Sequence, residues 1–209
     1  MKMKLLAAGV MLAFSIGSNA METTNPLLTP SKAPFGAPEF DKIKNEHYLP
    51  AFEVGIAEAK AEIDAIVANP EEPTFENTIE AMEFSGRTLN RVAGIFYNLM
   101  EANTNDQMQE MAEKITPMMT EFSMYVSLND ALFQRVKAVY EKKNELGLEQ
   151  DQMKLLEDAY KSFVRGGANL TPEQKEKLKE FEKSVNNDKN YKKNKNFFEK
   201  LKSFFDDND

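Results

Sequence analysis

The chain has 209 residues, no cysteine and a single histidine, which excludes disulfides, thiol catalysis and thiolate metal sites. Its formal net charge is -8, and the acidic excess lies between Met21 and Glu182 because both ends of the sequence are net positive. A body this acidic repels phosphate backbones and anionic lipids, so we expect it to bind no nucleic acid.

The start of the sequence has the features of an export signal. Lys2 and Lys4 give a positive beginning, residues 5–16 form a short apolar run, and small residues precede Met21. We therefore predict a signal peptide over residues 1–20 and an exported, periplasmic protein. An amphipathic first helix of the folded domain is the alternative. After cleavage we expect no membrane attachment, because a span needs about 20 apolar residues and no later run supplies them.

Residues 21–39 predict an extended arm. Its prolines recur every four residues, at Pro26, Pro30, Pro34 and Pro38. A proline fixes φ and has no N–H to donate, so this density excludes a helix. Leu27, Leu28 and Phe35 are too apolar for a solvated linker, and we expect the arm to lie against the body.

Residues 40–182 predict a helical body. Apolar residues three and four apart indicate a first helix that begins near Tyr48 and ends before Asn69. Pro73 stops the preceding segment, and Thr74 can then act as the N-cap of a second helix. The apolar spacing of that helix continues to Leu99, which predicts one long amphipathic element.

Four more helical patterns follow along the chain. The pattern over residues 108–126 contains Pro117, which predicts a kink or a split. The next begins at Asp130, with Gly147 as a left-handed stop. A third covers residues 155–163 and is closed by Gly166, and Thr171 opens the last with a capping box. The sequence contains no alternating strand pattern, so we predict an all-α fold.

Four segments of this body resemble one protein family. They are EFDKIKNEHYLPAFEVGIAEAKAEIDAI (residues 39–66), PTFENTIEAMEFSGRTLNRV (73–92), LNDALFQRVKAVY (128–140) and LLEDAYKSFVRGGANL (155–170). Together they are similar to the N-terminal part of the thimet oligopeptidase family of zinc metallopeptidases, in the branch of the bacterial peptidyl-dipeptidase Dcp and oligopeptidase A. The resemblance runs from about Phe35 to Glu182.

The resemblance implies a two-lobed, almost wholly helical enzyme that cleaves short peptides in a channel between its lobes. The Dcp branch releases C-terminal dipeptides. The resemblance also implies zinc, held by a His-Glu-x-x-His helix and a further glutamate. This chain has only His47 and no such motif, so none of the family's zinc ligands, nor its catalytic glutamate, has a counterpart here. We expect the N-terminal lobe without the catalytic lobe, and no catalytic, cofactor-binding or metal-binding residue. A separately supplied catalytic lobe is then a partner to consider.

Residues 183–209 differ in composition from the body, being rich in Asn, Lys, Phe and Asp. One interpretation is an amphipathic terminal helix, because Phe197, Phe198, Leu201, Phe204 and Phe205 have helical spacing. The other is a tail foreign to the family, produced by a frameshift or a truncated gene. We favour the second, because the family continues with further helices at this point.

Other residues have the chemistry of a site but a simpler explanation. His47 lacks the partner ligands that zinc needs, and we expect it to cap or pack the first helix. Glu71, Glu72 and Glu76 fit the start of a helix for dipole reasons alone. The acidic end resembles a calcium loop without its glycine or bidentate glutamate; it consists of Asp206, Asp207, Asn208 and Asp209. Five methionines offer a pliable peptide-binding face, although helical spacing favours a core; they are Met108, Met111, Met118, Met119 and Met124.

Three functions are consistent with these observations. The first is the N-terminal portion of a secreted peptidyl-dipeptidase, inactive by itself because the zinc motif is absent. The second is a non-catalytic helical module that binds peptides, and the third is a truncated gene product without function. We expect the first, with peptides as the ligands of the intact enzyme.

Overall fold

The structure, a computed structural model, describes residues 25–187, with side chains to residue 184. The predicted signal peptide and most of the predicted tail lie outside these residues. In chain order the elements are the 3-10 turns η1 (Pro34–Gly36) and η2 (Asn45–His47), α1 (Tyr48–Ala68), the π-helical turn η3 (Phe75–Glu80), α2 (Ala81–Glu83), α3 (Arg87–Ala102), α4 (Asp106–Ser127), α5 (Asp130–Glu141), α6 (Gln150–Arg165) and α7 (Pro172–Asn187). No strand occurs between residues 25 and 187, which confirms the all-α prediction.

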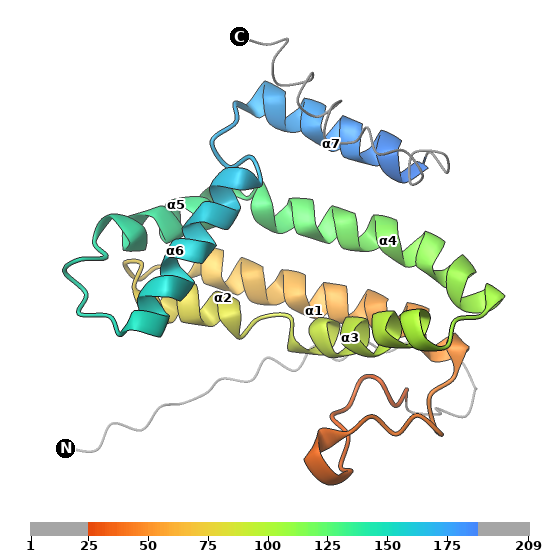
Figure 1. The fold of residues 1–209 in the computed structure, drawn as a ribbon. Helices are drawn as coiled ribbons and strands as arrows, with labels where there is room; N and C mark the ends of the chain where they lie inside the picture. The colour runs from red at the N-terminus through yellow and green to blue at the C-terminus, as the bar shows by residue number, and fades with distance from the viewer. Residues whose placement is uncertain (1–24, 188–209) are drawn as a thin grey trace.

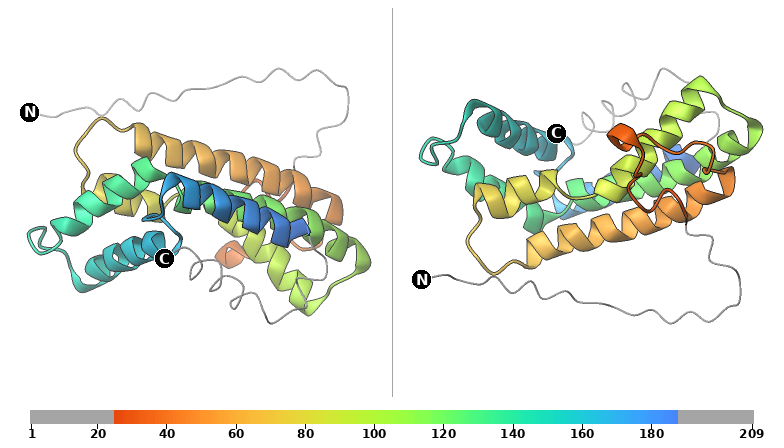
Figure 2. Two further views of the ribbon diagram at one scale, coloured as in Figure 1. Left: turned by 90° about the horizontal axis from the view of Figure 1, so that it is seen from above. Right: turned by 90° about the horizontal axis from the view of Figure 1, so that it is seen from below.

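The helices form an elongated bundle with the N-terminal arm at one end (Figures 1 and 2). α1 packs on both α3 and α4, and α7 packs on α4, so that α4 lies between α1 and α7 (Figure 1). At the end opposite the arm, α5 and α6 pack against each other and against η3. None of the helices in this described part of the chain is long and apolar enough to cross a membrane.

Two hydrophobic cores hold the bundle together, and α1 contributes to both. The first joins α1 to α3 and α4; its largest fully buried members are Leu27, Tyr48, Phe52, Leu89, Val92, Phe96 and Ile115. The Phe96 ring meets Tyr48 and Phe52 edge-on, with centroids 5.1 and 5.6 Å apart, a favoured aromatic geometry. The second core joins the end of α1 to η3, α5 and α6; its members include Ile63, Ile79, Leu132, Phe133, Val136, Leu156 and Phe163.

The long helix predicted from Thr74 to Leu99 is wrong, because the chain breaks between α2 and α3. Its start is confirmed, since the Thr74 side chain accepts a hydrogen bond from the Asn77 N–H. At the break, Gly86 adopts a left-handed φ of 66°, which costs a glycine little. The Gly86 N–H then donates to the Glu62 carboxylate of α1 at 2.6 Å. The break therefore joins the start of α3 to α1.

Other features of the helices differ from expectation. α4 runs unbroken from Asp106 to Ser127, so of the kink or split predicted at Pro117 the split does not occur. Gly147 has the predicted left-handed φ, 64°, but α5 already ends at Glu141. The glycine therefore serves the turn into α6 rather than the end of α5. α7 continues to Asn187, so it includes the first residues of the predicted tail.

The arm lies on the body at one point and projects elsewhere. Leu27 is 1% exposed and belongs to the first core, with Leu28 packed beside it, as predicted. Phe35 was expected to pack too, and this is wrong, because its side chain is fully exposed at 107%. It has a φ of 60° in the turn η1, at the tip of the projecting loop.

Candidate functional site

His47 holds the approach to α1. Its Nδ1 accepts a hydrogen bond from the Lys44 N–H at 3.1 Å, and its carbonyl accepts one from the Asn25 side-chain amide at 2.7 Å. The first bond closes the turn η2 and the second ties this turn to the arm, whereas the His47 side chain makes no capping hydrogen bond to α1 itself. Among the described residues no group of three or more His, Cys, Asp or Glu side chains could hold a metal ion. The donor set of this chain therefore does not fit the zinc that the resemblance implies.

The acidic residues near the second predicted helix do not form a carboxylate pair. Glu71, Glu72 and Glu76 are all exposed, and it is the backbone of this segment that makes contacts. The Glu71 carbonyl accepts from Arg135 Nη1 at 3.2 Å, and the Glu72 carbonyl accepts from the Asn77 side-chain amide at 2.9 Å. These glutamates thus lie in a structural turn. The terminal cluster Asp206–Asp209 lies outside the described residues.

The predicted methionine face is divided between the core and a groove. Four members pack into or against the first core, namely Met108, Met111, Met118 and Met119. Met124 instead lines a groove of about 350 Å³ between α4 and α7. We call this the α4–α7 groove; its lining includes Thr120, Ser123, Met124, Ser127, Leu128, Arg165, Gly166, Gly167, Leu178 and Glu182. A second hollow of about 380 Å³ shares Met124 and Leu128 with it. The two hollows therefore adjoin each other between α4 and α7.

Two glycines let α6 end against the wall of the α4–α7 groove. A Cβ at Gly166 would lie 2.9 Å from the Cβ of Ser127, closer than real side chains approach. Gly167 has a φ of 93°, in the left-handed region that favours glycine. The predicted helix stop at this pair is confirmed, because α6 ends at Arg165. The glycines thus set how close α6 and α4 come.

The electrostatics of the α4–α7 groove centre on a partly buried carboxyl group. Burial raises the pKa of Glu182 above its usual value, since desolvation disfavours the charged form. At the other end of α7, Lys175 is 6% exposed and pairs with the Asp130 carboxylate. A cleft that holds a perturbed carboxyl beside apolar side chains is a candidate binding site. With neither histidine nor cysteine in its wall, the groove lacks the usual pairing of nucleophile and base.

A tyrosine on α4 links this region to α1. The Tyr125 hydroxyl donates to the Asp64 carboxylate, and this hydrogen bond, with burial, raises the pKa of Tyr125 to about 12. Lys60 Nζ lies 5.2 Å from the centre of the Tyr125 ring and 3.6 Å from the Glu121 carboxylate. Because Tyr125 and Glu121 also line the second hollow, one of its walls is fixed by α1.

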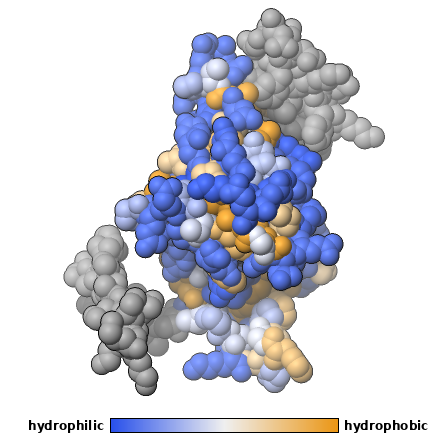
Figure 3. Space-filling model, turned by 90° about the vertical axis from the view of Figure 1, so that its left-hand side faces the viewer, coloured by the Kyte–Doolittle hydropathy of each residue, from blue (hydrophilic) through white to orange (hydrophobic). Residues whose placement is uncertain are grey.

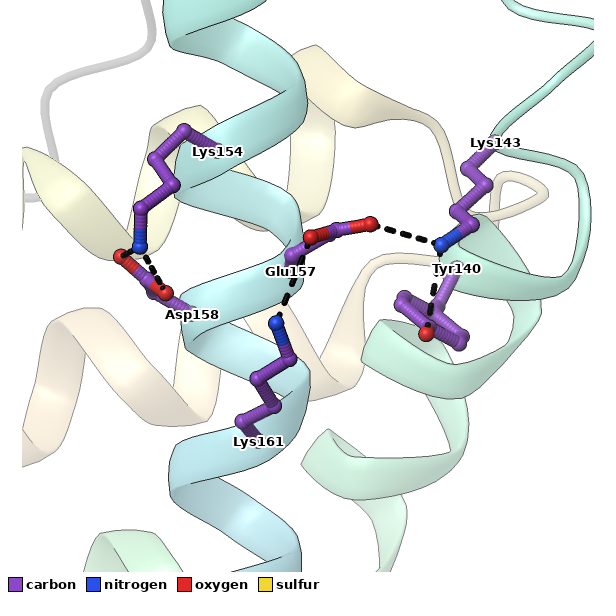
Figure 4. A network of polar contacts seen from close by, with 6 residues as sticks. All are labelled: Tyr140, Lys143, Lys154, Glu157, Asp158 and Lys161. Atoms are coloured by element: carbon purple, nitrogen blue, oxygen red, sulfur yellow. Dashed lines mark hydrogen bonds and ion pairs between the residues drawn. The ribbon is translucent and has the colours of Figure 1, made fainter.

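A separate polar network joins α5 to α6 at the far end of the molecule (Figure 4). Lys143 Nζ bonds the Glu157 carboxylate at 2.8 Å, and Lys161 approaches the same group at 3.3 Å. Both lysines lower the pKa of Glu157, with the Lys143 hydrogen bond as the larger cause. Tyr140 and Tyr160 stack beneath with ring centres 4.0 Å apart. Much of the surface at this end of the molecule is hydrophilic (Figure 3), and the network joins α6 to the turn that follows α5.

Sequence reasoning missed Arg135, the central polar residue of the second core. It is 9% exposed and donates to the Asn69 carbonyl, the Glu71 carbonyl and Asn77 Oδ1 at 2.9–3.2 Å. The sequence could have indicated its burial, because Arg135 lies three residues after Leu132 and therefore on the apolar face of α5. An arginine on such a face is buried only where acceptors meet it.

Comparison with known proteins identifies the fold. A family model for the N-terminal domain of neurolysin/thimet oligopeptidase matches residues 52–175. A model for the C-terminal region of the chaperone protein DnaJ matches residues 173–207, which begin in α7 and extend past the described residues.

Curated relatives agree with the first match. The dipeptidyl carboxypeptidase of Escherichia coli (strain K12) is 43% identical over 159 residues, 76% of this chain and 23% of the relative. That of Salmonella typhimurium is 42% identical over 157 residues, 75% of this chain and 23% of the relative. The oligopeptidase A of Salmonella typhimurium is 26% identical over 157 residues, 75% of this chain and 22% of the relative. The chain thus spans about a quarter of the length of these relatives. Because the first family model matches more than half of it, the chain belongs to the neurolysin/thimet oligopeptidase family and carries that family's N-terminal domain.

Proposed function

We propose that this chain is the non-catalytic N-terminal region of an exported metallopeptidase of the peptidyl-dipeptidase type, without peptidase activity by itself. The observation that carries the proposal is the 43% identity to a dipeptidyl carboxypeptidase over 76% of this chain, which covers only 23% of that relative. The chemistry of the donor set also supports it, since His47 is the single histidine and cysteine is absent. In the intact enzyme, zinc would supply activated water for peptide hydrolysis. This chain would supply a rigid helical wall.

The rigidity of that wall follows from its cores. α1 contributes side chains to both hydrophobic cores, so the arm end and the α5–α6 end are joined by one continuous helix. A surface held in this way can orient a bound peptide without changing shape. We therefore assign the chain a positioning role.

The experiment measures zinc and peptide cleavage in the full chain. The purified protein is equilibrated with zinc, dialysed and assayed for bound metal, and then incubated with a peptide blocked at its N-terminus. We expect far less than one zinc per chain and no released dipeptide, while the Escherichia coli relative, as a positive control, releases it. Stoichiometric zinc together with dipeptide release from this chain would refute the proposal. Export is tested separately, by the N-terminal sequence of the protein recovered from a periplasmic extract. We expect it to begin near Met21, and an intact Met1 would contradict export.

A second candidate function, peptide binding without chemistry, is favoured by the α4–α7 groove. Its apolar residues Met124, Leu128 and Leu178 lie beside the polar Ser123 and Glu182, a mixture suited to an extended peptide. Calorimetry with unstructured peptides tests it. Ser123→Trp should abolish saturable binding by filling the groove, and Gln109→Trp, at an exposed position on the same helix, should leave it unchanged. Equal binding by both variants would remove the groove from consideration.

A further inference from the structure

A second concave site lies at the other end of the molecule, between the N-terminal arm and α3. We call it the arm pocket. It has a volume of about 490 Å³, and its wall includes Arg91 and Ile95 of α3, Pro30 and Lys32 of the arm, and Lys42 and Ile43 of the segment before η2. The arm loops out from the body and returns to it at the start of α1 (Figure 2, right). The volume is within the range of sites that bind small molecules.

Hydrogen bonds fix the base of the arm pocket. The Leu27 side chain is buried in the first core, and its carbonyl accepts a hydrogen bond from Arg91 Nη2 at 3.1 Å. The Leu27 N–H donates to Asn25 Oδ1 at 3.0 Å, and the Asn25 amide donates to the His47 carbonyl at 2.7 Å. The arm is thus attached both to α3 and to the turn before α1. These attachments hold the arm in place at the base of the pocket.

The charge of the arm pocket is opposite to that of the chain. Lys32, Lys42 and Arg91 face one acidic residue of the lining, Glu39, which pairs with Lys42 at 2.5 Å. Two cations therefore remain without a carboxylate among the described residues, in a chain of net charge -8. The Arg91 side chain is half-buried, and the Leu27 carbonyl is its single hydrogen-bond acceptor in the described structure. A guanidinium has five donors, so Arg91 retains capacity for an anion.

The rest of the wall is apolar. It includes the arm prolines Pro26, Pro30 and Pro38 together with Ile43 and Ile95. Inorganic phosphate would satisfy the cations but leave this apolar surface in water. An ion with a hydrocarbon part would satisfy both, since burying apolar surface is favourable at about 25 cal/mol per Å². Arginine also pairs with a planar carboxylate through two parallel hydrogen bonds. Charge and shape together therefore favour a carboxylate attached to an apolar group.

We propose that the arm pocket binds an apolar monocarboxylate, whose carboxylate pairs with Arg91 and Lys32 and whose hydrocarbon part lies between the arm prolines and Ile95. The C-terminal end of a short peptide and a free carboxylic acid both carry this chemistry. The site lies apart from the α4–α7 groove and involves no bond cleavage. It therefore does not depend on the proposed function.

Amide NMR titration of the full chain with four probes tests the proposal. The probes are N-acetyl-leucine, N-acetyl-alanyl-leucine, the C-terminal amide of the latter, and inorganic phosphate. We expect both acids to shift the amides of the arm and of Arg91, and the amide probe to bind at least about tenfold more weakly. Tighter binding of the dipeptide acid identifies a peptide end as the ligand, and equal binding identifies a free carboxylic acid. Absence of shifts with either acid, or equal shifts with the amide probe or phosphate, would overturn the proposal.

Variants locate the site. Arg91→Met should weaken binding of the acids by at least about tenfold, and Lys32→Met by about two- to fivefold. Lys32 has no ion-pair partner among the described residues, so Lys32→Met leaves the arm attached to the body. It therefore tests the site even if Arg91→Met loosens the arm. Lys137→Met removes an exposed lysine of α5 that pairs only within its own helix, and it should bind like the wild type. Wild-type affinity in both Arg91→Met and Lys32→Met would refute the assignment.

Discussion

Asn77 connects the start of the second helical region to the second core. Its Oδ1 accepts hydrogen bonds from the Thr74 N–H at 2.8 Å, the Thr78 hydroxyl at 2.9 Å and Arg135 Nη2 at 3.1 Å. Thr78 is fully buried, and Arg135 is 9% exposed. Asn77→Ala would therefore leave two buried donors without this acceptor, while the exposed Thr74 N–H can turn to water.

The cost of Asn77→Ala follows from those two donors. Leaving a buried polar group unsatisfied costs about 1–3 kcal/mol, with charged groups at the upper end. Thr78 can recover part of its loss by turning its hydroxyl to a carbonyl of the preceding turn. We expect the free energy of unfolding to fall by about 2–4 kcal/mol, a large part of a typical 5–15 kcal/mol. Urea denaturation followed by far-ultraviolet circular dichroism measures it, with an unchanged m-value as evidence that the transition stays two-state.

Two variants separate this mechanism from a general effect of losing an asparagine. Asn77→Asp keeps the acceptor, adds a negative charge beside Arg135 and suits the first turn of a helix; we expect stability within about 1 kcal/mol of the wild type. Asn98→Ala removes an exposed asparagine that bonds only the Gly94 carbonyl of its own helix, and it should cost under about 0.5 kcal/mol. If Asn77→Asp is as destabilised as Asn77→Ala, or if Asn77→Ala behaves like Asn98→Ala, the reasoning fails.

Three more predictions concern single positions. Gly86→Ala should lower the free energy of unfolding by about 1–2 kcal/mol, because Gly86 has a φ of 66°. Gly94→Ala, inside α3 and with open space around the added Cβ, should raise it by up to about 1 kcal/mol. Urea denaturation that ranks the two variants the other way would contradict this. The pKa of Tyr125 is raised to about 12, so the stability that its hydrogen bond to Asp64 contributes should be lost as pH rises from about 10 to about 12. Thermal melts over this pH range should show the loss in the wild type but not in Tyr125→Phe. The raised pKa of Glu182 means that the folded protein favours the neutral carboxyl, which is lost as pH rises. Glu182→Gln should therefore have a higher melting temperature than the wild type near pH 7 but not near pH 4. The same difference in melting temperature at both pH values would disprove this.

Local capping chemistry made the helix starts predictable. Thr74 and Thr171 carry caps whose partners lie three residues away, at Asn77 and Gln174, and three residues of sequence suffice to see them. The α6 stop at Gly166 was equally local. Such features need no knowledge of the rest of the fold.

The break at Gly86 was hidden by the period of the apolar pattern. From Met82 to Leu89 the pattern advances by seven residues, which is almost two helical turns, so the apolar face appears continuous across the gap. The sequence signal for the break was the lack of an apolar residue at Ser85 or Gly86, where a continuous helix would place one. What fixes the break is Glu62, on another helix 24 residues earlier, and sequence periodicity carries no information about that contact.

The candidate sites were less predictable because each depends on segments far apart in the sequence. Arg135 meets acceptors that lie 58 to 66 residues before it, and Arg91 meets the Leu27 carbonyl 64 residues before it. Both arginines have their roles only once the helices pack. The α4–α7 groove is likewise formed where α7 returns to α4, and the methionine pattern alone could not separate Met124 from the methionines of the core.

The segments that reveal the family are also the ones that build the cores. Residues 39–66 supply Phe52 and Ile63, residues 73–92 supply Ile79 and Leu89, and the two later segments supply most of the second core. Side chains packed in this way tolerate little change in volume, so a match in these segments reports the shape of the domain. It does not report the reaction, because these side chains are buried in the two cores. Membership of the family therefore follows directly from the matched residues, whereas the activity of this chain must be measured at its concave surfaces, the α4–α7 groove and the arm pocket.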